Sequence, residues 1–349
     1  MVFRHAFAAL LLAGAVPAAL HAQPAAADAE MRAVLAEHAA LTPRPIGRLT
    51  PEQARREPSP ADAVMSLLRT RDQPRTPEPV ARVEYRTIPG PGGAIPVKLY
   101  TPMGAASGTP LPVVVYYHGG GFVIATVETY DSSARAIANA AGAVVMSVEY
   151  RKGPEHRFPA AHDDAFAAYE WALANAAQIG GDPARVAVAG ESAGGNLAAA
   201  TAMTARERGV RMPVHQLLVY PVVDNDTNTP SYRQNAAAAP LNRATMQWFF
   251  RHYTSPAAAG DMRLTPLRGR LAGLPSATVI TAQIDPLRSE GEAYAQALRA
   301  AGVEVDYAHF DGVAHEFFGM GAVHPKARAA VARAGQNLRR AFGTATPTR

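Results

Sequence analysis

Short apolar runs alternate with amphipathic stretches along the middle and the C-terminal part of the chain. Residues 112–117 (PVVVYY) and 143–148 (AVVMSV) are continuous apolar runs, as expected of strands that are buried on both faces. Further strands are predicted at 80–88, 95–100, 185–189, 215–220, 277–282 and 303–310. Helices are predicted at 132–141, 165–178, 194–208, 290–301 and 326–342. This alternation predicts an α/β fold with a mostly parallel sheet and helices on both of its faces.

The alternation is absent from two segments. Residues 23–79 are rich in Ala, Arg and Pro, and they contain short helical patterns at 27–38, 51–56 and 61–69. The second segment runs from Asp224 to about Leu274, with a helical pattern at 242–253. We expect residues 23–79 to form an N-terminal cap segment and residues 80–349 to form the α/β domain, with a cap insert at about 224–262.

Composition narrows the chemistry that this chain can perform. Of its 349 residues, 48% are hydrophobic and 18% are charged, which is the balance of an ordinary soluble globular protein. The net charge of +5 comes from basic residues that are scattered along the sequence, and no nucleic-acid-binding motif accompanies them, so we expect no nucleic-acid partner. The chain has no Cys, which excludes a thiol nucleophile, a disulfide framework and a Cys-ligated zinc site.

The first 22 residues have the pattern of a signal peptide. Arg4 and His5 precede the apolar stretch 6–20, and Leu20-His21-Ala22 ends on a small residue before Gln23. An uncleaved N-terminal anchor is the alternative interpretation. No other stretch is long and apolar enough to span a bilayer, so none is expected after cleavage. The pattern predicts export, to the periplasm or outside the cell.

Gly190-Glu191-Ser192-Ala193-Gly194 fits the pattern G-x-S-x-G. An apolar strand leads directly into this pentapeptide, and an Ala-rich helix leads directly out of it. That context predicts a nucleophile elbow, a tight turn that lifts the Ser192 hydroxyl above the sheet edge. The two glycines suit a turn in which neighbouring backbone leaves no room for a Cβ. An ordinary strand-to-helix turn is the alternative.

A serine nucleophile needs a base, and the base needs an acid that orients it. In a fold of this kind the acid and the base follow the serine in the order Asp/Glu, then His, at the ends of later strands. Asp285 follows the strand 277–282, and His315 follows the strand 303–310. We therefore predict Asp285 as the acid and His315 as the base, with Asp311 as the competing acid.

The segment His118-Gly119-Gly120-Gly121 follows the strand 112–117. Glycines allow backbone N–H groups to point at a developing oxyanion without obstruction by side chains. We assign the oxyanion hole to the N–H groups of Gly120, Gly121 and Ala193, and expect His118 to shape the loop. A phosphate-binding loop is the alternative, but neither G-x-G-x-x-G nor Gly-Lys-Ser/Thr is present. Together these groups predict acyl transfer.

These motifs resemble those of the bacterial hormone-sensitive-lipase-like esterase family. The resemblance rests on HGGG about 70 residues before GESAG, on the later DPL and His, and on the stretch from Tyr150-Arg151 to Phe158-Pro159-Ala160-Ala161. It covers nearly everything from Gln23 onward. It implies an eight-stranded sheet with a cap, and a carboxylesterase for short- to medium-chain acyl esters that uses no cofactor or metal. In this family chains often pair through the last strand and helix, so the resemblance is compatible with a homodimer.

Three positions depart from the family pattern. Lys152-Gly153 stands where Leu-Ala is usual, Ser289 where Asp is common, and Glu316 where Gly usually follows the base. Glu191, Arg151 and Glu155 are interpreted as members of structural ion pairs. The same site also suits a lactonase, a carbohydrate deacetylase or a peptidase, whereas a true lipase is disfavoured because the cap segments have few large apolar residues. The alternative outside enzymes is a binding protein for small molecules.

Overall fold

The structure is a computed structural model that describes residues 27–106 and 108–345. The predicted signal peptide, residues 1–22, lies outside these residues. None of the helices in the described part of the chain is long and apolar enough to cross a membrane.

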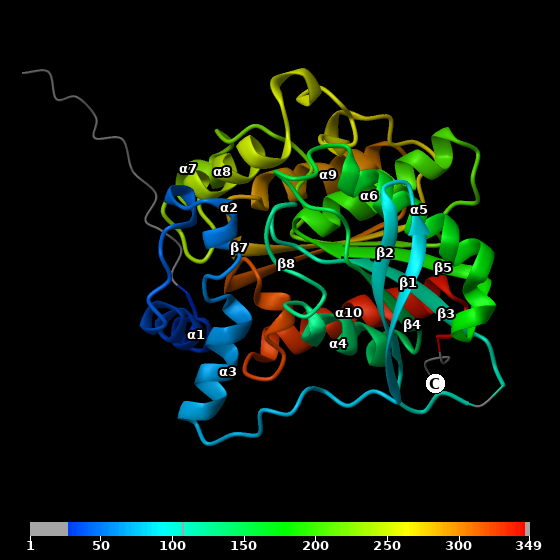
Figure 1. Ribbon diagram of the computed structural model, residues 1–349, viewed down its shortest axis with the longest axis horizontal. Coiled ribbons are helices and arrows are strands. Elements are labelled where there is room, and N and C mark those ends of the chain that lie inside the picture. Colours follow the sequence, from blue (N-terminus) through cyan, green and yellow to red (C-terminus); the bar gives the residue numbers. More distant parts are fainter. Residues whose placement is uncertain (1–26, 107, 346–349) are drawn as a thin grey trace, which may run out of the picture.

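One eight-stranded sheet forms the centre of the molecule, as predicted (Figure 1). Its strands lie in the order β1-β2-β4-β3-β5-β6-β7-β8. The β1–β2 and β2–β4 pairs are antiparallel and the other pairs are parallel. The bounds are β1 Arg82–Gly90, β2 Gly93–Thr101, β3 Leu111–Tyr117, β4 Val144–Val148, β5 Gly181–Glu191, β6 Gln216–Val219, β7 Ala277–Ile284 and β8 Val305–Ala314.

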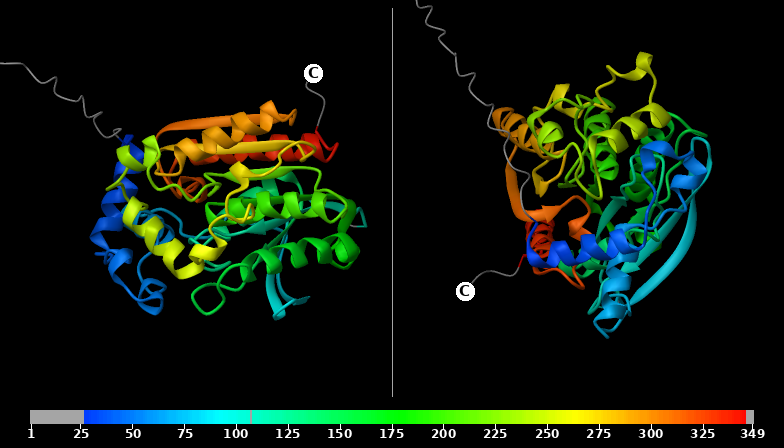
Figure 2. Two further views of the ribbon diagram at one scale, coloured as in Figure 1. Left: turned by 90° about the horizontal axis from the view of Figure 1, so that it is seen from above. Right: turned by 90° about the vertical axis from the view of Figure 1, so that its left-hand side faces the viewer.

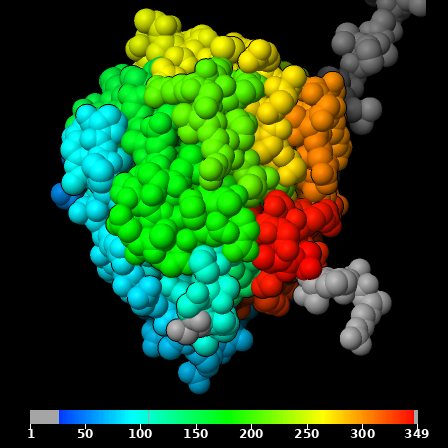
Figure 3. All heavy atoms as spheres, turned by 90° about the vertical axis from the view of Figure 1, so that its right-hand side faces the viewer, coloured from blue at the N-terminus to red at the C-terminus, as the bar shows by residue number. Residues whose placement is uncertain are grey.

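Helices cover both faces of the sheet (Figures 1 and 2). On one face lie α4 (Asp131–Ala141) and α10 (Pro325–Ala341), and on the other lie α5 (Ala160–Asn175), α6 (Ala193–Glu207) and α9 (Arg288–Ala300). Each face therefore has its own apolar core. The view in Figure 3 shows the C-terminal end of α10, in red, at the surface beside orange residues near 300. The helix also contacts β8, the strand at one edge of the sheet.

The N-terminal segment and the insert contribute the remaining helices. The segment contains α1 (Ala29–Ala40), α2 (Pro51–Ala54) and α3 (Pro60–Thr70), and the insert contains α7 (Pro230–Gln234) and α8 (Arg243–Tyr253). Short 3₁₀ helices complete the described secondary structure: Ile46–Arg48, Ala176–Ile179, Pro256–Ala258, Pro266–Arg268 and Phe317–Gly319. The two segments meet where the Trp248 indole N–H donates to the Leu49 carbonyl at 3.0 Å.

Local sequence explains where the N-terminal helices begin. Thr50 and Ser59 both accept a hydrogen bond from the backbone N–H three residues later, and the side chains of Gln53 and Asp62 accept one in return. Each pair is a capping box, which satisfies two N–H groups that the first turn of a helix leaves unpaired. Such caps fix short helices that have little core of their own.

The last strand is longer than the pattern of apolar residues predicted. The predicted strand ends at Phe310, but β8 continues to Ala314, which pairs with Ile284. Gly312 remains in the strand because its N–H donates to the Gln283 side chain at 2.6 Å and its carbonyl accepts from Asp28 at 2.9 Å. The base therefore follows the strand directly.

Candidate active site

Ser192 stands between the end of β5 and the first residue of α6. Its φ of 57° and ψ of −118° are a strained conformation for a residue with a side chain. The glycines on either side of it leave no room for a side chain. A Cβ on Gly190 would lie 2.1 Å from the Gly194 carbonyl oxygen, and a Cβ on Gly194 would lie 1.9 Å from the Tyr117 carbonyl oxygen. The predicted elbow is present, and it holds the hydroxyl at the carboxyl edge of the sheet.

The structure brings the three predicted triad residues together. His315 Nε2 lies 3.0 Å from Ser192 Oγ, and His315 Nδ1 lies 2.7 Å from Asp285 Oδ2. A carboxylate only accepts hydrogen bonds, so Nδ1 carries the proton and Nε2 is left to accept from the serine hydroxyl. Ser192 is 4% exposed, His315 2% and Asp285 0%. Their burial keeps the two hydrogen bonds away from bulk water.

Two contacts hold the acid in place. Asp285 Oδ1 accepts a hydrogen bond from the Leu287 N–H at 2.8 Å, so the second oxygen is aimed at His315. The Asn235 side chain donates to the Asp285 carbonyl at 3.1 Å. The competing acid, Asp311, is exposed and lies 3.4 Å from His309 Nε2 instead. The geometry therefore selects Asp285 over Asp311 as the partner of the base.

The charge state of the base is governed by opposing effects. Burial lowers the pKa of His315, but the adjacent Asp285 carboxylate, with smaller contributions from Glu316 and Glu191, raises that pKa above its ordinary value of 6.5. A base with a raised pKa accepts the serine proton more readily.

The glycine loop after β3 lies beside the serine. Gly120 and Gly121 have φ values of +95° and +59°, which favour glycine. A Cβ on Gly121 would lie 2.1 Å from the ring of Phe249. The N–H groups of Gly120, Gly121 and Ala193 donate none of the hydrogen bonds found within residues 27–106 and 108–345. Three unpaired donors next to a nucleophile suit the stabilisation of an oxyanion.

His118 contacts the backbone of this loop and the ring of Tyr150. Its Nδ1 lies 2.8 Å from the Gly119 carbonyl oxygen, and its ring stacks on Tyr150. The Tyr150 hydroxyl donates to the His118 carbonyl at 2.8 Å. Burial lowers the pKa of His118 to about 4, so the ring is neutral at ordinary pH. These contacts fit a shaping role and leave proton transfer to His315.

Arg55 ties the N-terminal segment to the loop that follows the glycines. Its guanidinium group donates to the Val123 carbonyl at 2.9 Å and to the Gly153 carbonyl at 2.8 Å. It also forms an ion pair with Glu155 at 2.6 Å, which confirms the interpretation of Glu155. Arg151 likewise pairs with Asp164 at 2.8 Å.

The interpretation of Glu191 as an ion-pair member is wrong. Its carboxylate has no cationic partner among the described residues and accepts hydrogen bonds from the hydroxyls of Tyr116, at 2.6 Å, and Tyr220. Burial raises the pKa of Glu191 to about 7. The sequence offered little indication of this arrangement, because Tyr116 lies on β3 and Tyr220 directly follows β6.

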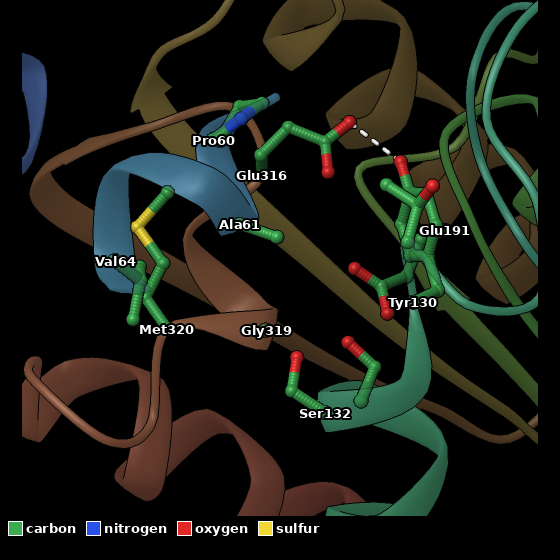
Figure 4. Close-up of a pocket in the computed structure, with 11 residues that line it drawn as sticks. Pro60, Ala61, Val64, Tyr130, Ser132, Glu191, Glu316, Gly319 and Met320 are labelled. Carbon is green, nitrogen blue, oxygen red and sulfur yellow. Dashed lines mark hydrogen bonds between the residues drawn. The ribbon is translucent and has the colours of Figure 1, made fainter. Parts of the chain in front are cut away.

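A small cavity lies beside α3 (Figure 4). Glu191 and Glu316, the neighbours in sequence of Ser192 and His315, both line it, as does Tyr130. The helix α3 contributes Pro60, Ala61 and Val64 to the opposite side. No group of three His, Cys, Asp or Glu side chains within the described ranges is arranged to hold a metal ion.

The chain is similar in sequence and in fold to known proteins. The sequence pattern of the α/β-hydrolase fold matches residues 114–319, which is more than half of the chain. The chain belongs to the α/β-hydrolase family. Carboxylesterase NlhH from Mycobacterium tuberculosis is 43% identical over 267 residues, covering 75% of this chain and 83% of that protein.

Two further relatives extend the comparison. Ethyl acetate hydrolase from Pseudomonas putida is 37% identical over 235 residues, or 66% of this chain and 74% of that protein. The structure of the hyperthermophilic esterase from the archaeon Pyrobaculum calidifontis superposes with a TM-score of 0.82 at 38% identity, covering 90% of this chain and 98% of that one. These proteins bear out the resemblance to bacterial hormone-sensitive-lipase-like esterases.

Proposed function

We propose that this α/β-hydrolase cleaves short- to medium-chain carboxylic esters through an acyl-enzyme on Ser192. The observation that carries the proposal is the buried hydrogen-bond chain from Ser192 through His315 to Asp285, beside three unpaired backbone N–H groups. Carboxylesterase and ethyl acetate hydrolase, the names of two relatives, describe the same reaction class.

The first half of the reaction acylates the serine. Ser192 Oγ attacks the ester carbonyl carbon while His315 Nε2 takes the hydroxyl proton. The carbonyl oxygen becomes an oxyanion, which the N–H groups of Gly120, Gly121 and Ala193 stabilise. When the tetrahedral intermediate collapses, the C–O bond to the alcohol breaks, and the proton on Nε2 passes to the leaving alkoxide.

The second half releases the acid. A water molecule gives a proton to His315 Nε2 and attacks the acyl carbon, and the same N–H groups hold the second oxyanion. The bond to Oγ then breaks, Ser192 regains its proton from Nε2, and the carboxylic acid leaves. Asp285 keeps its hydrogen bond to Nδ1 throughout and stabilises the positive charge on the ring.

The preference for short and medium acyl chains is supported by what surrounds the serine. Phe249 of α8 lies directly over Gly121, and the triad side chains are almost fully covered. Arg55 and Trp248 hold the N-terminal segment and the insert close to the glycine loop. A closely covered serine of this kind suits a small acyl group better than a long chain.

A p-nitrophenyl ester series from acetate to palmitate tests the proposal, with wild type measured beside Ser192→Ala. We expect the highest kcat/KM for acyl chains of two to eight carbons and a loss of several orders of magnitude in the variant. Activity that survives in Ser192→Ala, or a folded wild type that cleaves no ester, would reject it. If the protein cleaved only lactones or acetylated sugars, the proposed mechanism would stand and the proposed substrate class would be wrong.

We also propose that the protein is exported after cleavage near Ala22, supported by the signal-peptide pattern of residues 1–22. N-terminal sequencing of protein from the periplasm and the medium tests this, and an intact Met1 would contradict it. A homodimer through β8 and α10 stays a prediction. It is supported by the position of β8 at the edge of the sheet, with α10 next to it (Figure 3).

A further inference from the structure

The residue after the base has an unusual backbone conformation. Glu316 has a φ of 74° and a ψ of 1°, in the left-handed region where a side chain costs about 1 kcal/mol or more. Glycine, which usually occupies this position in the resembling esterases, has no such cost. Strain of this kind persists only where surrounding contacts hold it, so the contacts of Glu316 are informative.

The strained backbone turns the Glu316 side chain towards the triad. Glu316 Oε1 accepts a hydrogen bond from the Tyr130 hydroxyl at 2.6 Å (Figure 4). The same oxygen lies 3.9 Å from His315 Nε2, the nitrogen that faces Ser192 Oγ. The carboxyl group is thus near the atom that gains the proton, whereas Asp285 contacts the opposite nitrogen of the ring.

Tyr130 connects this carboxyl group to the oxyanion loop. A Cβ on Gly119 would lie 2.2 Å from the Tyr130 hydroxyl oxygen, so the hydroxyl packs directly against the loop backbone. Tyr130 itself is buried, just before the first turn of α4. One hydrogen bond therefore joins the segment that carries the base to the segment that carries two of the oxyanion donors.

Other titratable groups also face this region. Asp285 approaches the base from the loop after β7, and Glu191 approaches from the end of β5. Glu191 is hydrogen-bonded by Tyr116 and Tyr220, and the Tyr220 ring lies 4.4 Å from the His315 ring. Of the two carboxyl groups that line the cavity, Glu316 is the one within 4 Å of His315 Nε2.

We propose that Glu316 is a second positioning residue for the base, which, held by Tyr130, stabilises protonated His315 from the Nε2 side. This inference rests on the proposed function, in which Nε2 gains and loses a proton twice in each cycle. A negative charge about 4 Å from that nitrogen stabilises the imidazolium that forms each time Nε2 takes a proton.

The proposal predicts the direction in which the pKa of His315 changes when the charge of Glu316 is removed. Burial raises the pKa of Glu316, while His315 and the Tyr130 hydroxyl lower it, so the carboxyl group responds to the charge on the ring. Removing its charge lowers the pKa of His315, because one of the groups that raise it is lost. The base is then weaker, but it stays neutral to lower pH.

Glu316→Gln tests this with little change in shape, since the amide oxygen still accepts from Tyr130. We expect kcat/KM for p-nitrophenyl butyrate to fall about tenfold at alkaline pH, and the acidic limb of its pH profile to move about one unit lower. Asp311→Asn is the matched control: it removes one negative charge from the same strand, where the carboxylate is 81% exposed and faces His309. We expect its profile to match wild type.

A second readout separates this inference from the proposed function. NMR titration of ¹⁵N-histidine-labelled protein, with the His315 signal assigned by its absence in His315→Asn, measures the pKa directly. A lower pKa of His315 in Glu316→Gln supports the inference, even if the protein cleaves no ester. The absence of ester cleavage would reject only the proposed function. The inference would be overturned if the pKa of His315 measured by NMR and the acidic limb of the pH profile were both the same in Glu316→Gln as in wild type.

Glu316→Gly guards against a purely structural effect. It removes the side chain and also the backbone strain at a φ of 74°. We expect a thermal midpoint at least equal to that of wild type together with the activity loss and the shift seen for Gln. A less stable protein with a wild-type pH profile would instead show that Glu316 serves only the fold.

Discussion

Asp285→Asn is the substitution that most sharply separates the acid from its competitor. The side chain keeps its size, and its carbonyl oxygen can still accept the Leu287 N–H that now bonds Oδ1. The amide NH₂ group must then face His315 Nδ1, where Oδ2 lies at 2.7 Å. Because NH₂ only donates, Nδ1 becomes the acceptor and the ring proton moves to Nε2, which faces Ser192.

That change of tautomer removes the base without removing the ring. A ring with its proton on Nε2 cannot take the serine proton, and it lacks the carboxylate that stabilises the imidazolium. In a serine protease the equivalent change lowers kcat about 10⁴-fold, and we expect a loss of about 10³- to 10⁴-fold here. This corresponds to about 4–5 kcal/mol of transition-state stabilisation. Stability should change little, because a neutral amide replaces a buried charge in the same space.

The assay is kcat and KM for p-nitrophenyl butyrate at a pH where wild type is on its plateau, with thermal unfolding as a check on folding. Asp311→Asn is the control, since it makes the same chemical change at the competing acid and should keep wild-type activity. The reasoning is refuted if Asp285→Asn keeps more than about a tenth of the activity, or if Asp311→Asn loses as much.

Three further outcomes follow from the geometry. Gly121→Ala places a Cβ 2.1 Å from the Phe249 ring, so kcat should fall about 100-fold or more, and an unchanged kcat would contradict the assigned oxyanion loop. Arg55→Ala removes the ion pair with Glu155 and two bonds to carbonyls, so thermal unfolding should show a loss of about 1–2 kcal/mol; an unchanged midpoint would show that these contacts add nothing. In wild type, kcat/KM should fall at acidic pH as His315 is protonated, with a midpoint above pH 6.5 because the pKa of His315 is raised; a midpoint below that value would contradict this account.

The sequence predicted the parts of this molecule that local pattern determines. Buried parallel strands require continuous apolar runs, so strands such as β3 and β4 were recognisable from the sequence alone. The residues at their carboxyl ends meet at one edge, which is why Ser192, Asp285 and His315 could be proposed as neighbours before any distance was known. The requirement for glycine at Gly190 is equally local, because a Cβ there would meet the Gly194 carbonyl of the same turn.

Other features depend on contacts between distant segments, which no local pattern records. β8 extends to Ala314 because Gln283 and Asp28 satisfy Gly312, whereas the apolar pattern predicted an end at Phe310. Glu191 was misinterpreted because its partners are tyrosine hydroxyls from other strands. The hydrogen bond between Tyr130 and Glu316 joins residues 186 positions apart, so the departure at Glu316 was visible in the sequence while its meaning was not.

Covalent labelling tests the central claim, a Ser192 nucleophile activated by His315, most directly. The protein is incubated with a p-nitrophenyl alkylphosphonate, and the modified residue is located by peptide mass spectrometry while released p-nitrophenol is counted. We expect one p-nitrophenol for each protein molecule, the phosphonate on Ser192, and no labelling of Ser192→Ala. A phosphonate on another residue, or a folded wild type that is not labelled, would contradict the account.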